Sequence, residues 1–221
     1  MKELISSGLE ALGLTGSVPP DAAEKLAEYG RLLLEKNQVM NLTAIRDEAG
    51  VARLHMLDCA ALLPCADLTG ARTLLDVGTG AGFPGLPLKI LLPQLDVTLL
   101  DSLNKRVDWL NEVSAQLGLT GVRAIQGRAE EKALEKSIRD SFELVTARAV
   151  ADLRLLSELC LPFVKVGGRF LSMKSVDSDQ ELDQAAHAIK LLGGRVRDVK
   201  DYAIPGADVT HRLVIVEKVA P

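Results

Sequence analysis

The segment Leu74–Gly85, with the sequence LLDVGTGAGFPG, constrains the fold of this chain more than any other part. An apolar run ends at Asp76 and Val77, and glycines then alternate with other residues up to Pro84, which suits the first position of a helix. Glycine lacks Cβ and permits positive φ, so a nucleoside can lie against the main chain beside a helix N-terminus. The segment therefore predicts a buried strand, a nucleoside-binding turn and a helix in succession.

From Arg72 onward, short β-branched and leucine-rich runs alternate with amphipathic segments, as in parallel βαβ units. The expected parallel strands are Thr73–Val77, Asp96–Leu100, Gly121–Gln126, Phe142–Thr146 and Gly168–Met173. Helices, for example Asn104–Leu117, fill the gaps between them. The chain is thus expected to form a mostly parallel sheet with helices on both faces.

Two further strand-like runs, Arg195–Ala203 and His211–Lys218, are joined by a segment too short to contain a crossover helix. They are therefore expected to pair as an antiparallel hairpin. A hairpin that closes a doubly wound sheet distinguishes methyltransferases of the Rossmann type from ordinary dinucleotide-binding proteins. The expected fold class is α/β, a Rossmann-like class I methyltransferase with a doubly wound, mostly parallel seven-stranded sheet, a C-terminal antiparallel hairpin and an N-terminal helical cap.

The N-terminal part of the chain reads as helical throughout. Pro19 and Pro20 open a segment to Asn37 in which Leu26 and Leu33 recur at helical spacing. We expect residues 1–65 to form a helical cap and residues 66–221 to form an S-adenosylmethionine-binding methyltransferase domain. The two are expected to be one compact unit, because 221 residues with 48% hydrophobic composition suffice for one full core.

The glycine turn leaves two alternatives open. Gly80, Gly82 and Gly85 also satisfy the GxGxxG pattern, which would indicate an NAD-dependent oxidoreductase, and the turn could also be purely structural. An acid at the end of the strand, Asp76, followed by alternating glycines favours S-adenosylmethionine, and the closing hairpin agrees. Gly78 and Gly80 are therefore candidate cofactor-binding residues.

Two later segments supply further acids at the ends of strands. Asp101 ends the second strand, where its carboxylate can accept both ribose hydroxyls of a nucleoside cofactor. Capping of the next helix by Asp101 or Ser102 is the alternative. Ala129 and Glu130 follow the third strand and are expected at the adenine edge, although Glu130 and Glu131 could be ordinary acids of a first helical turn.

The segment after the fourth strand, Val145–Ala149, lacks the Asp/Asn-Pro-Pro-aromatic motif with which methyltransferases bind exocyclic amines. The Pro64-Cys65 pair precedes the glycine turn, so a cysteine nucleophile for carbon methylation of pyrimidines is not expected. Guanine N7 has a free lone pair at neutral pH and needs no general base. Proximity alone, which can supply about 7–11 kcal/mol, suits this reaction.

Arg148 is the candidate catalytic residue of this segment, in a positioning role. Because the methylated ring is cationic, we expect Arg148 to bind the cofactor carboxylate or an RNA phosphate and not that ring. A structural salt bridge is the alternative. Under the first interpretation, Arg148→Ala should abolish methylation with little loss of folding.

The net charge of −4 and the isoelectric point near 5.5 argue against a protein that coats nucleic acid. Basic side chains after the strands or at the closing hairpin could still bind RNA phosphates at the cofactor edge of the sheet, although scattered surface charge is the alternative. The candidate RNA-binding residues are Lys105, Arg106, Arg128, Arg154, Lys174 and Arg212. Phe83 or Trp109 could stack on one base, although Trp109 suits helix packing better.

Neither a disulfide framework nor a metal site is expected. Cys59, Cys65 and Cys160 have no CxxC spacing, and the three histidines have no HxxxH spacing. The first residues lack the pattern of a secretory signal, and no apolar run is long enough to span a bilayer. We therefore expect a monomeric cytoplasmic protein with no metal and no membrane partner.

These motifs resemble the bacterial enzymes that methylate a guanine N7 in small-subunit (16S) ribosomal RNA, also called the glucose-inhibited division protein B family. The matching segments are Met40–Thr43, His55 with Asp58, Asp76–Leu88, Leu100–Ser102 with Lys105 and Arg106, Gly127–Glu131, Ala147–Ala149, Gly167–Phe170 with Lys174, and His211 with Arg212. The resemblance runs through most of the chain, and the glycine run ending in Phe-Pro-Gly is its most specific part. Cys59, Trp109 and Ser175 depart from the family pattern outside the glycine turn.

The resemblance implies S-adenosylmethionine as the cofactor, with contacts from the glycine turn and from later segments. The implied contact residues are Gly78, Phe83, Asp101, Ser102, Leu103, Ala129, Glu130 and Arg148. It also implies 16S ribosomal RNA, in the small subunit or an assembly intermediate, as the substrate methylated at guanine N7. A class I methyltransferase for a protein or small molecule is the alternative function, and a non-catalytic binding module is a further one.

Overall fold

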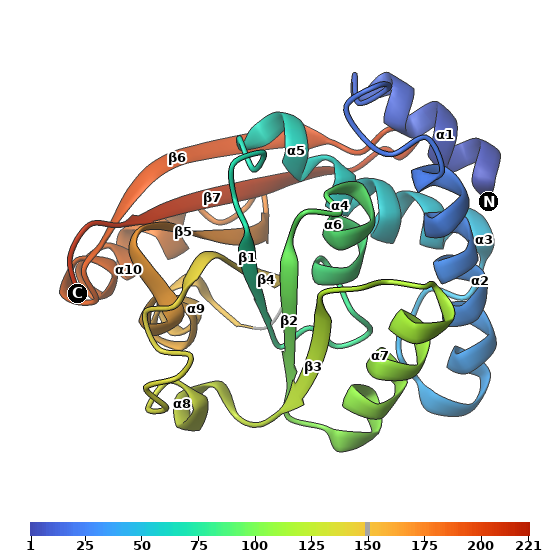
Figure 1. Cartoon of the computed structure of the whole chain (residues 1–221). Coiled ribbons are helices and arrows are strands. Elements are labelled where there is room, and N and C mark those ends of the chain that lie inside the picture. Colours follow the sequence, from blue (N-terminus) through green and yellow to red (C-terminus); the bar gives the residue numbers. More distant parts are fainter. Residues whose placement is uncertain (149–150) are drawn as a thin grey trace.

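The structure is a computed structural model that describes residues 1–148 and 151–221. A seven-stranded sheet in the order β3-β2-β1-β4-β5-β7-β6 crosses the molecule (Figure 1). Its strands are β1 (Thr73–Val77), β2 (Asp96–Asp101), β3 (Val122–Gln126), β4 (Phe142–Arg148), β5 (Val164–Ser175), β6 (Gly194–Ala203) and β7 (Thr210–Lys218). Strands β1 to β5 are parallel, and β7 pairs antiparallel with β5 and β6. The predicted doubly wound sheet with its closing hairpin is confirmed.

Strands β4 and β5 are longer than predicted. β4 continues to Arg148, because Ala147 and Arg148 still pair with Ser172 and Met173 of β5. β5 in turn begins at Val164, before the glycines that were expected to open it. Arg148 is therefore fixed by the end of a strand and does not lie in a loop, whereas Ala149 of the same motif lies outside the described residues.

Helices cover both faces of the sheet (Figure 1). One face is covered by the N-terminal helices and by the two helices that follow β1 and β2. These are α1 (Lys2–Ala11), α2 (Ala22–Met40), α3 (Glu48–Val51), a π-helical turn (Ala52–Leu57), α4 (Asp58–Ala60), α5 (Leu62–Cys65), α6 (Gly85–Leu91) and α7 (Asn104–Gln116). The other face is covered by α8 (Ala129–Lys132), α9 (Leu153–Cys160), a 3-10 turn (Leu161–Phe163) and α10 (Asp179–Leu191).

The strands divide their side chains between two cores, as the two-residue period of a β-strand requires. In β1, Leu74 packs among the N-terminal helices, whereas Leu75 and Val77 pack on the side of α9 and α10. Leu26 and Leu33 of α2 are fully buried in the same core as Leu74. The cap and the sheet thus share one core, while the boundary at residue 65 stays a prediction.

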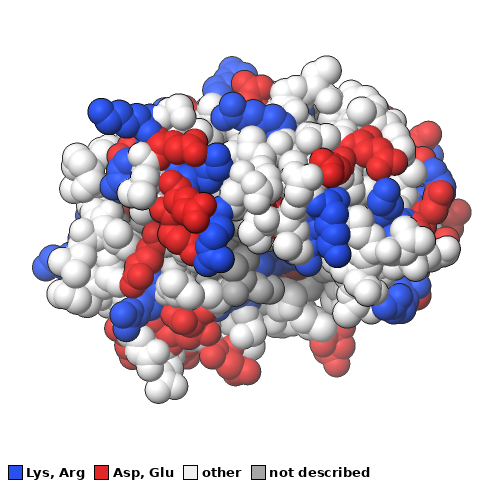
Figure 2. All heavy atoms as spheres, turned by 90° about the horizontal axis from the view of Figure 1, so that it is seen from below, with Lys and Arg blue, Asp and Glu red and all other residues white. Residues whose placement is uncertain are grey.

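The parallel strands all end at one edge of the sheet, where β7, which runs in the opposite direction, begins. Ligands of open α/β sheets bind at this edge. Figure 2 looks onto it and shows a central hollow with Lys and Arg side chains around it and Asp and Glu side chains among them. The candidate site therefore lies at this hollow.

Candidate active site

The predicted glycine turn lies at this edge, between β1 and α6. Gly78, Gly80 and Gly82 have φ angles of 65°, 59° and 104°, in the region that favours glycine. The Thr79 N–H donates to the carbonyl oxygen of Leu100 at 3.0 Å, which ties the turn to the end of β2. The turn thus presents main chain, and not side chains, toward the carboxyl edge of the sheet.

Asp76, the acid at the end of β1, is fully buried behind the turn. Its carboxylate accepts hydrogen bonds from the Thr79 hydroxyl at 2.6 Å, the Thr146 hydroxyl at 2.9 Å and the Gly85 N–H at 2.9 Å. The last bond satisfies the first N–H of α6, since the helix begins at Gly85. The prediction that Pro84 is the first helical residue is wrong, because Pro84 is the N-cap residue.

Burial raises the pKa of Asp76 to about 6, against a usual value of 3.8. The pKa of Asp76 is higher in the folded protein than in the unfolded chain. The stability contributed by the protonated carboxyl is therefore present below about pH 4 and is lost as the pH rises through 6. We expect Asp76→Asn, whose amide can keep the three hydrogen bonds without a charge, to lack this loss of about 3 kcal/mol. Urea unfolding of both proteins between about pH 4 and pH 8 measures the difference. Parallel stability profiles of the two proteins would contradict the prediction.

Asp101, at the end of β2, is buried and organises two stretches of main chain. The Gly80 N–H donates to Oδ2 at 2.9 Å, and the Leu103 N–H donates to Oδ1 at 3.0 Å. The Arg106 guanidinium lies 3.5 Å from Oδ2. The N-cap residue of α7 is Leu103, so neither Asp101 nor Ser102 occupies the capping position of the alternative interpretation. A carboxylate can accept about four hydrogen bonds, which leaves Asp101 able to accept from ligand hydroxyls.

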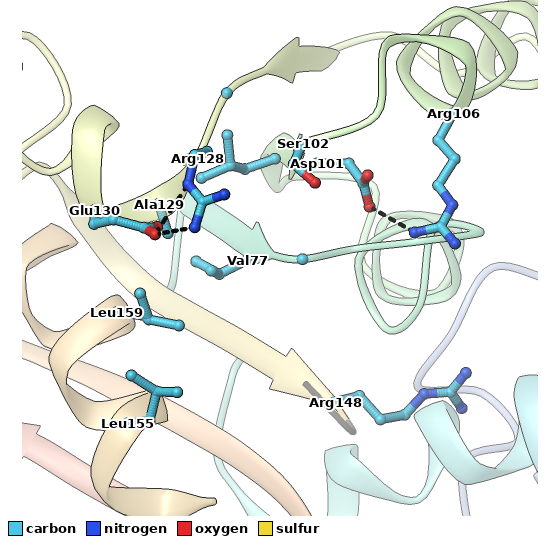
Figure 3. Close-up of a pocket in the computed structure, with 13 residues that line it drawn as sticks. Val77, Asp101, Ser102, Arg106, Arg128, Ala129, Glu130, Arg148, Leu155 and Leu159 are labelled. Carbon is cyan, nitrogen blue, oxygen red and sulfur yellow. Dashed lines mark hydrogen bonds and ion pairs between the residues drawn. The ribbon is translucent and has the colours of Figure 1, made fainter. Parts of the chain in front are cut away.

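A pocket of about 490 Å³ opens between the ends of β1 to β4 and the helix α9 (Figure 3). The predicted cofactor residues that line it are Gly78, Asp101, Ser102, Ala129, Glu130 and Arg148. Four apolar side chains, Val77, Leu100, Leu155 and Leu159, also line it. The three other predicted residues, Gly80, Phe83 and Leu103, lie outside this lining. The structure thus brings together most of the predicted cofactor residues.

Arg128 and Glu130 form an ion pair beside this first pocket, with Nη2 and Oε1 2.6 Å apart (Figure 3). Main-chain and Arg128 hydrogen bonds lower the pKa of Glu130. Glu130 and Glu131 both lie in the first turn of α8, as the alternative interpretation supposed. Glu130 lines the pocket as well, so the two interpretations are compatible.

Phe83 is buried beneath the glycine turn, so its ring is not exposed to an incoming base. The ring stacks on His55, with centroids 4.4 Å apart, and on Tyr29 at 5.2 Å. The Arg148 guanidinium lies 4.9 Å from its centroid, within range of a cation–π interaction. Trp109 is buried at 6.3 Å from Tyr29, in agreement with helix packing. Stacking of RNA bases on Phe83 or Trp109 does not fit these positions.

Arg148 joins the cap to the end of β4. Its Nη1 donates to Asp58 Oδ2 and to the Leu54 carbonyl, each at 3.2 Å, and its Nη2 lies 3.0 Å from His55 Nδ1. Because arginine can only donate, His55 Nδ1 accepts, and Nε2–H faces the Thr43 hydroxyl at 2.8 Å. Burial lowers the pKa of His55 to about 3, in agreement with a neutral ring. The salt bridge of the alternative interpretation is present, so Arg148→Ala is no longer expected to spare folding.

A second pocket, of about 480 Å³, adjoins the first at Arg148, which lines both. It lies between the cap and the ends of β4, β5 and β7. Its other lining residues are Leu54, His55, Asp58, Met173, Lys174, Ser175 and His211. The two pockets thus meet at the side chain that the sequence singled out as catalytic.

Asp58, the first residue of α4, joins three distant parts of the chain, although its side chain is only 2% exposed. Besides Arg148, its carboxylate accepts a hydrogen bond from the Tyr202 hydroxyl of β6 at 2.9 Å and one from His211 Nδ1 of β7 at 2.8 Å. The hydrogen bond to Asp58 raises the pKa of His211. No local pattern in the sequence assigns a role to these three residues, although Asp58 and His211 belong to segments that carry the family resemblance.

Of the candidate RNA-binding residues, Lys174 and Arg212 lie within β5 and β7, and the other four lie in or just before the helices that follow β2, β3 and β4. Five of the six are paired with acidic side chains. The pairs are Arg106–Asp101, Arg128–Glu130, Arg154–Glu158, Lys174–Glu181 and Arg212 with both Asp179 and Asp201. Lys105 is exposed in the first turn of α7. Figure 2 shows the same mixture of charges around the hollow. The edge is thus of mixed charge, and its role in RNA binding stays a prediction.

Two other kinds of site are absent from the described residues, and the cysteines are unpaired. Within residues 1–148 and 151–221, no three His, Cys, Asp or Glu side chains are grouped so that they could hold a metal ion. In the same residues no helix is both long and apolar enough to cross a membrane. Cys59, Cys65 and Cys160 are free thiols, all buried.

Comparison with known proteins places this geometry in a family. The family described as rRNA small subunit methyltransferase G matches residues 22–209. The ribosomal RNA small subunit methyltransferase G of Alkaliphilus metalliredigens is 44% identical over 218 residues, which cover 99% of this chain and 90% of that protein. Among solved structures, the mitomycin 7-O-methyltransferase MmcR has a TM-score of 0.61 at 18% identity, covering 86% of this chain and 60% of its own. TYW2 of M. jannaschii, solved in complex with AdoMet, has a TM-score of 0.53 at 14% identity, covering 68% of this chain and 72% of its own.

The two structural similarities concern the fold, and they agree with the Rossmann-like methyltransferase architecture derived from the sequence. The sequence similarity shows more than a common fold, because it extends over nearly the whole of both proteins. It also confirms the resemblance on which the expected activity was based. On this ground, the chain belongs to the rRNA small subunit methyltransferase G family.

Proposed function

We propose that this protein transfers a methyl group from S-adenosylmethionine to N7 of a guanine in 16S ribosomal RNA, within the small subunit or an assembly intermediate. One observation carries the proposal: Arg148 lines two adjoining pockets of similar size at the carboxyl edge of the sheet. The first has the main-chain turn and the acids of a nucleoside site, and the second can take an acceptor nucleotide. Membership of a methyltransferase family agrees with this arrangement.

The chemistry of the first pocket fits S-adenosylmethionine. Asp101 and Glu130 offer carboxylate oxygens to hydroxyl and amino donors, and Arg148 offers a guanidinium to a carboxylate. A Cβ at Gly80 would have open space around it, so the main chain of the turn is accessible. The residues proposed to hold the cofactor are Gly78, Gly80, Asp101, Ser102, Leu103, Ala129, Glu130 and Arg148, with Phe83 behind them. When bound, the cofactor supplies an electrophilic methyl group on a sulfonium sulfur.

The protein's own task is to position the acceptor, because guanine N7 has a free lone pair and loses no proton on methylation. The groups beside Arg148 that could act as bases are already engaged. His55 Nδ1 accepts from Arg148, and Asp58 accepts from Arg148, Tyr202 and His211. The Asp58 carboxylate, 3.2 Å from Arg148, also offsets the guanidinium charge and so lessens its repulsion of the cationic product ring.

We assign binding of the RNA backbone to the basic side chains at the same edge of the sheet. These are Lys105, Arg106, Arg128, Arg154, Lys174 and Arg212. Five of them already have acidic partners, so a phosphate would replace or share an existing ion pair. Recognition would then depend on the shape of the folded RNA or subunit as much as on charge. The cytoplasmic location and the monomeric state stay predictions.

The direct test is transfer of radiolabelled methyl from S-adenosylmethionine to small subunits, and to deproteinised RNA, from cells that lack this protein. Label recovered as 7-methylguanosine is the expected result. Cofactor binding without labelling of either RNA sample would favour a class I methyltransferase for a protein or small molecule, an alternative that the mixed charge of the edge keeps open. A comparison of the two samples also shows whether assembled subunits or free RNA are the substrate.

Asp101→Ala is expected to weaken binding of S-adenosylmethionine about 10- to 100-fold. The substitution removes a charged acceptor that fixes Gly80 and Leu103 and that is proposed to accept from the ribose hydroxyls. Isothermal titration calorimetry measures the change. Asp108→Ala, at an exposed position of α7, is the matched control and should bind as the unchanged protein does. Equal affinities for all three proteins would remove Asp101 from the site.

A further inference from the structure

His211 stands at the mouth of the second pocket with one ring nitrogen already committed. It is the second residue of β7, and its Nδ1 lies 2.8 Å from Asp58 Oδ1. Because a carboxylate can only accept, Nδ1 carries the proton of this bond. His211 lines the pocket and its side chain is 31% exposed, and within the described residues its other nitrogen, Nε2, has no hydrogen-bond partner. Most of the other polar groups of the pocket are saturated by protein partners.

The partner of His211 is held firmly enough to fix the ring. Asp58 is buried and is bound on its other sides by Tyr202 and Arg148. Tyr202 also packs edge-on against the imidazole, with centroids 6.2 Å apart and an interplanar angle of 87°. Asp58 of α4 and Tyr202 of β6 thus contact the imidazole directly, while Arg148 of β4 holds Asp58 in place. A ring held in this way presents Nε2 in one orientation.

The charges around the ring favour its protonated form. The ionisable groups near it are Asp58 on α4, Tyr202 on β6, Arg148 on β4, Lys174 on β5 and the neutral His55 of the cap. The hydrogen bond to Asp58 raises the pKa of His211 and outweighs both its partial burial and the nearby Arg148 charge. Because Nδ1 keeps its proton for Asp58, Nε2 carries a proton and acts as a donor only in the imidazolium form, whose share the raised pKa increases.

A donor at this place distinguishes purines. Guanine has acceptors at O6 and N7, whereas adenine has an amino group in place of O6. Leu54 and Met173 add apolar contact for a flat ring, whereas Lys174 and Arg148, the other cationic side chains of the pocket, already donate to protein partners. The pocket therefore suits a base that offers acceptors along one edge.

We propose that His211 donates Nε2–H to O6 of the acceptor guanine and is the residue of this chain that selects guanine over adenine. The inference rests on the proposed function and makes it more specific, because it assigns the recognition of the target base to the closing hairpin. Asp58 and Tyr202 are then positioning residues that act through His211. An apolar side chain at position 211, or an imidazole ring turned so that Nε2 no longer faces the base, would leave O6 without its donor.

The test pairs a variant with a substrate analogue that lacks the same hydrogen bond. The substrates are small subunits, or the smallest RNA that the protein methylates, carrying guanine, inosine or 2-aminopurine at the target position. All three keep N7, but 2-aminopurine lacks O6. The variant is His211→Asn, whose amide nitrogen can keep the bond to Asp58 while Nε2 is lost. His187→Asn, at an exposed position of α10, is the matched control.

For the unchanged protein, kcat/KM is expected to be about 10- to 100-fold lower with 2-aminopurine than with guanine or inosine. His211→Asn should lower kcat/KM for guanine and inosine by a similar factor and leave that for 2-aminopurine nearly unchanged. Equal losses on all three substrates, with an unchanged thermal unfolding midpoint, would show that His211 does not read O6. Absence of any transfer by the unchanged protein would count against the proposed function itself, which is a distinct result.

Discussion

Replacement of Arg148 by alanine is expected to reduce methyl transfer by about 100-fold or more and to lower the free energy of unfolding by about 3–5 kcal/mol. The loss of activity follows from the position of the guanidinium between the two pockets, where it aligns both ligands. The loss of stability follows from Asp58, which is 2% exposed and would lose its arginine partner. Methyl-transfer assays and urea unfolding measure the two effects separately.

Two further variants separate charge from position. Asp58→Asn in the Arg148→Ala background should restore part of the lost stability without activity, because it removes a buried carboxylate that has lost its arginine partner. Arg31→Ala, at a surface position of α2 with exposed ion pairs to Glu28 and Glu35, is the control and should leave the free energy of unfolding nearly unchanged. If the Arg148→Ala protein were as stable as the unchanged one, another group would have to compensate the buried Asp58 carboxylate in place of Arg148.

Gly82→Ala is expected to lower the free energy of unfolding by about 2–5 kcal/mol and to abolish cofactor binding. Gly82 has φ of 104°, and a Cβ there would lie 2.5 Å from the Tyr29 hydroxyl and 2.8 Å from Leu86 Cδ1. The Tyr29 hydroxyl donates to the Ala81 carbonyl, so it cannot move without breaking a buried hydrogen bond. The added methyl group must therefore displace the cap helix or the turn.

Gly80→Ala is the matched control for Gly82→Ala. Its φ of 59° is also in the left-handed region, but nothing lies within 4 Å of the added Cβ. It should therefore cost only the backbone strain, about 1–2 kcal/mol. Thermal and urea unfolding of both variants give the comparison. Equal destabilisation by the two substitutions would show that packing against α2 is not what distinguishes Gly82.

The sheet and the glycine turn could be predicted because their signals are local. A strand such as Leu74–Val77 and its glycines are contiguous in sequence, and the short link before β7 excludes a crossover helix. The extension of β4 to Arg148 could not be predicted in this way. It depends on pairing with Met173 of β5, to which the sequence near Arg148 gives no clue.

The contacts of the second pocket escaped prediction for the same reason. Asp58 is 90, 144 and 153 positions from Arg148, Tyr202 and His211, so no periodicity or motif links them. The ion pairs of the basic residues were not predicted, because the sequence shows the charge of each residue but not which oppositely charged side chains meet in the fold. Arg212, for example, reaches Asp179 of α10 across the edge of the sheet. Local patterns therefore located the cofactor pocket better than the acceptor pocket.

The three-way junction at Asp58 also has a consequence for the order in which the site can be completed during synthesis. Every predicted cofactor residue precedes residue 149, so the glycine turn and its acids emerge from the ribosome well before the last two strands. Until β6 and β7 are added, Asp58 lacks the Tyr202 and His211 donors, and the second pocket lacks one wall. The residues that line the first pocket all precede β6, so a nascent chain can complete that pocket before Tyr202 and His211 are available to Asp58.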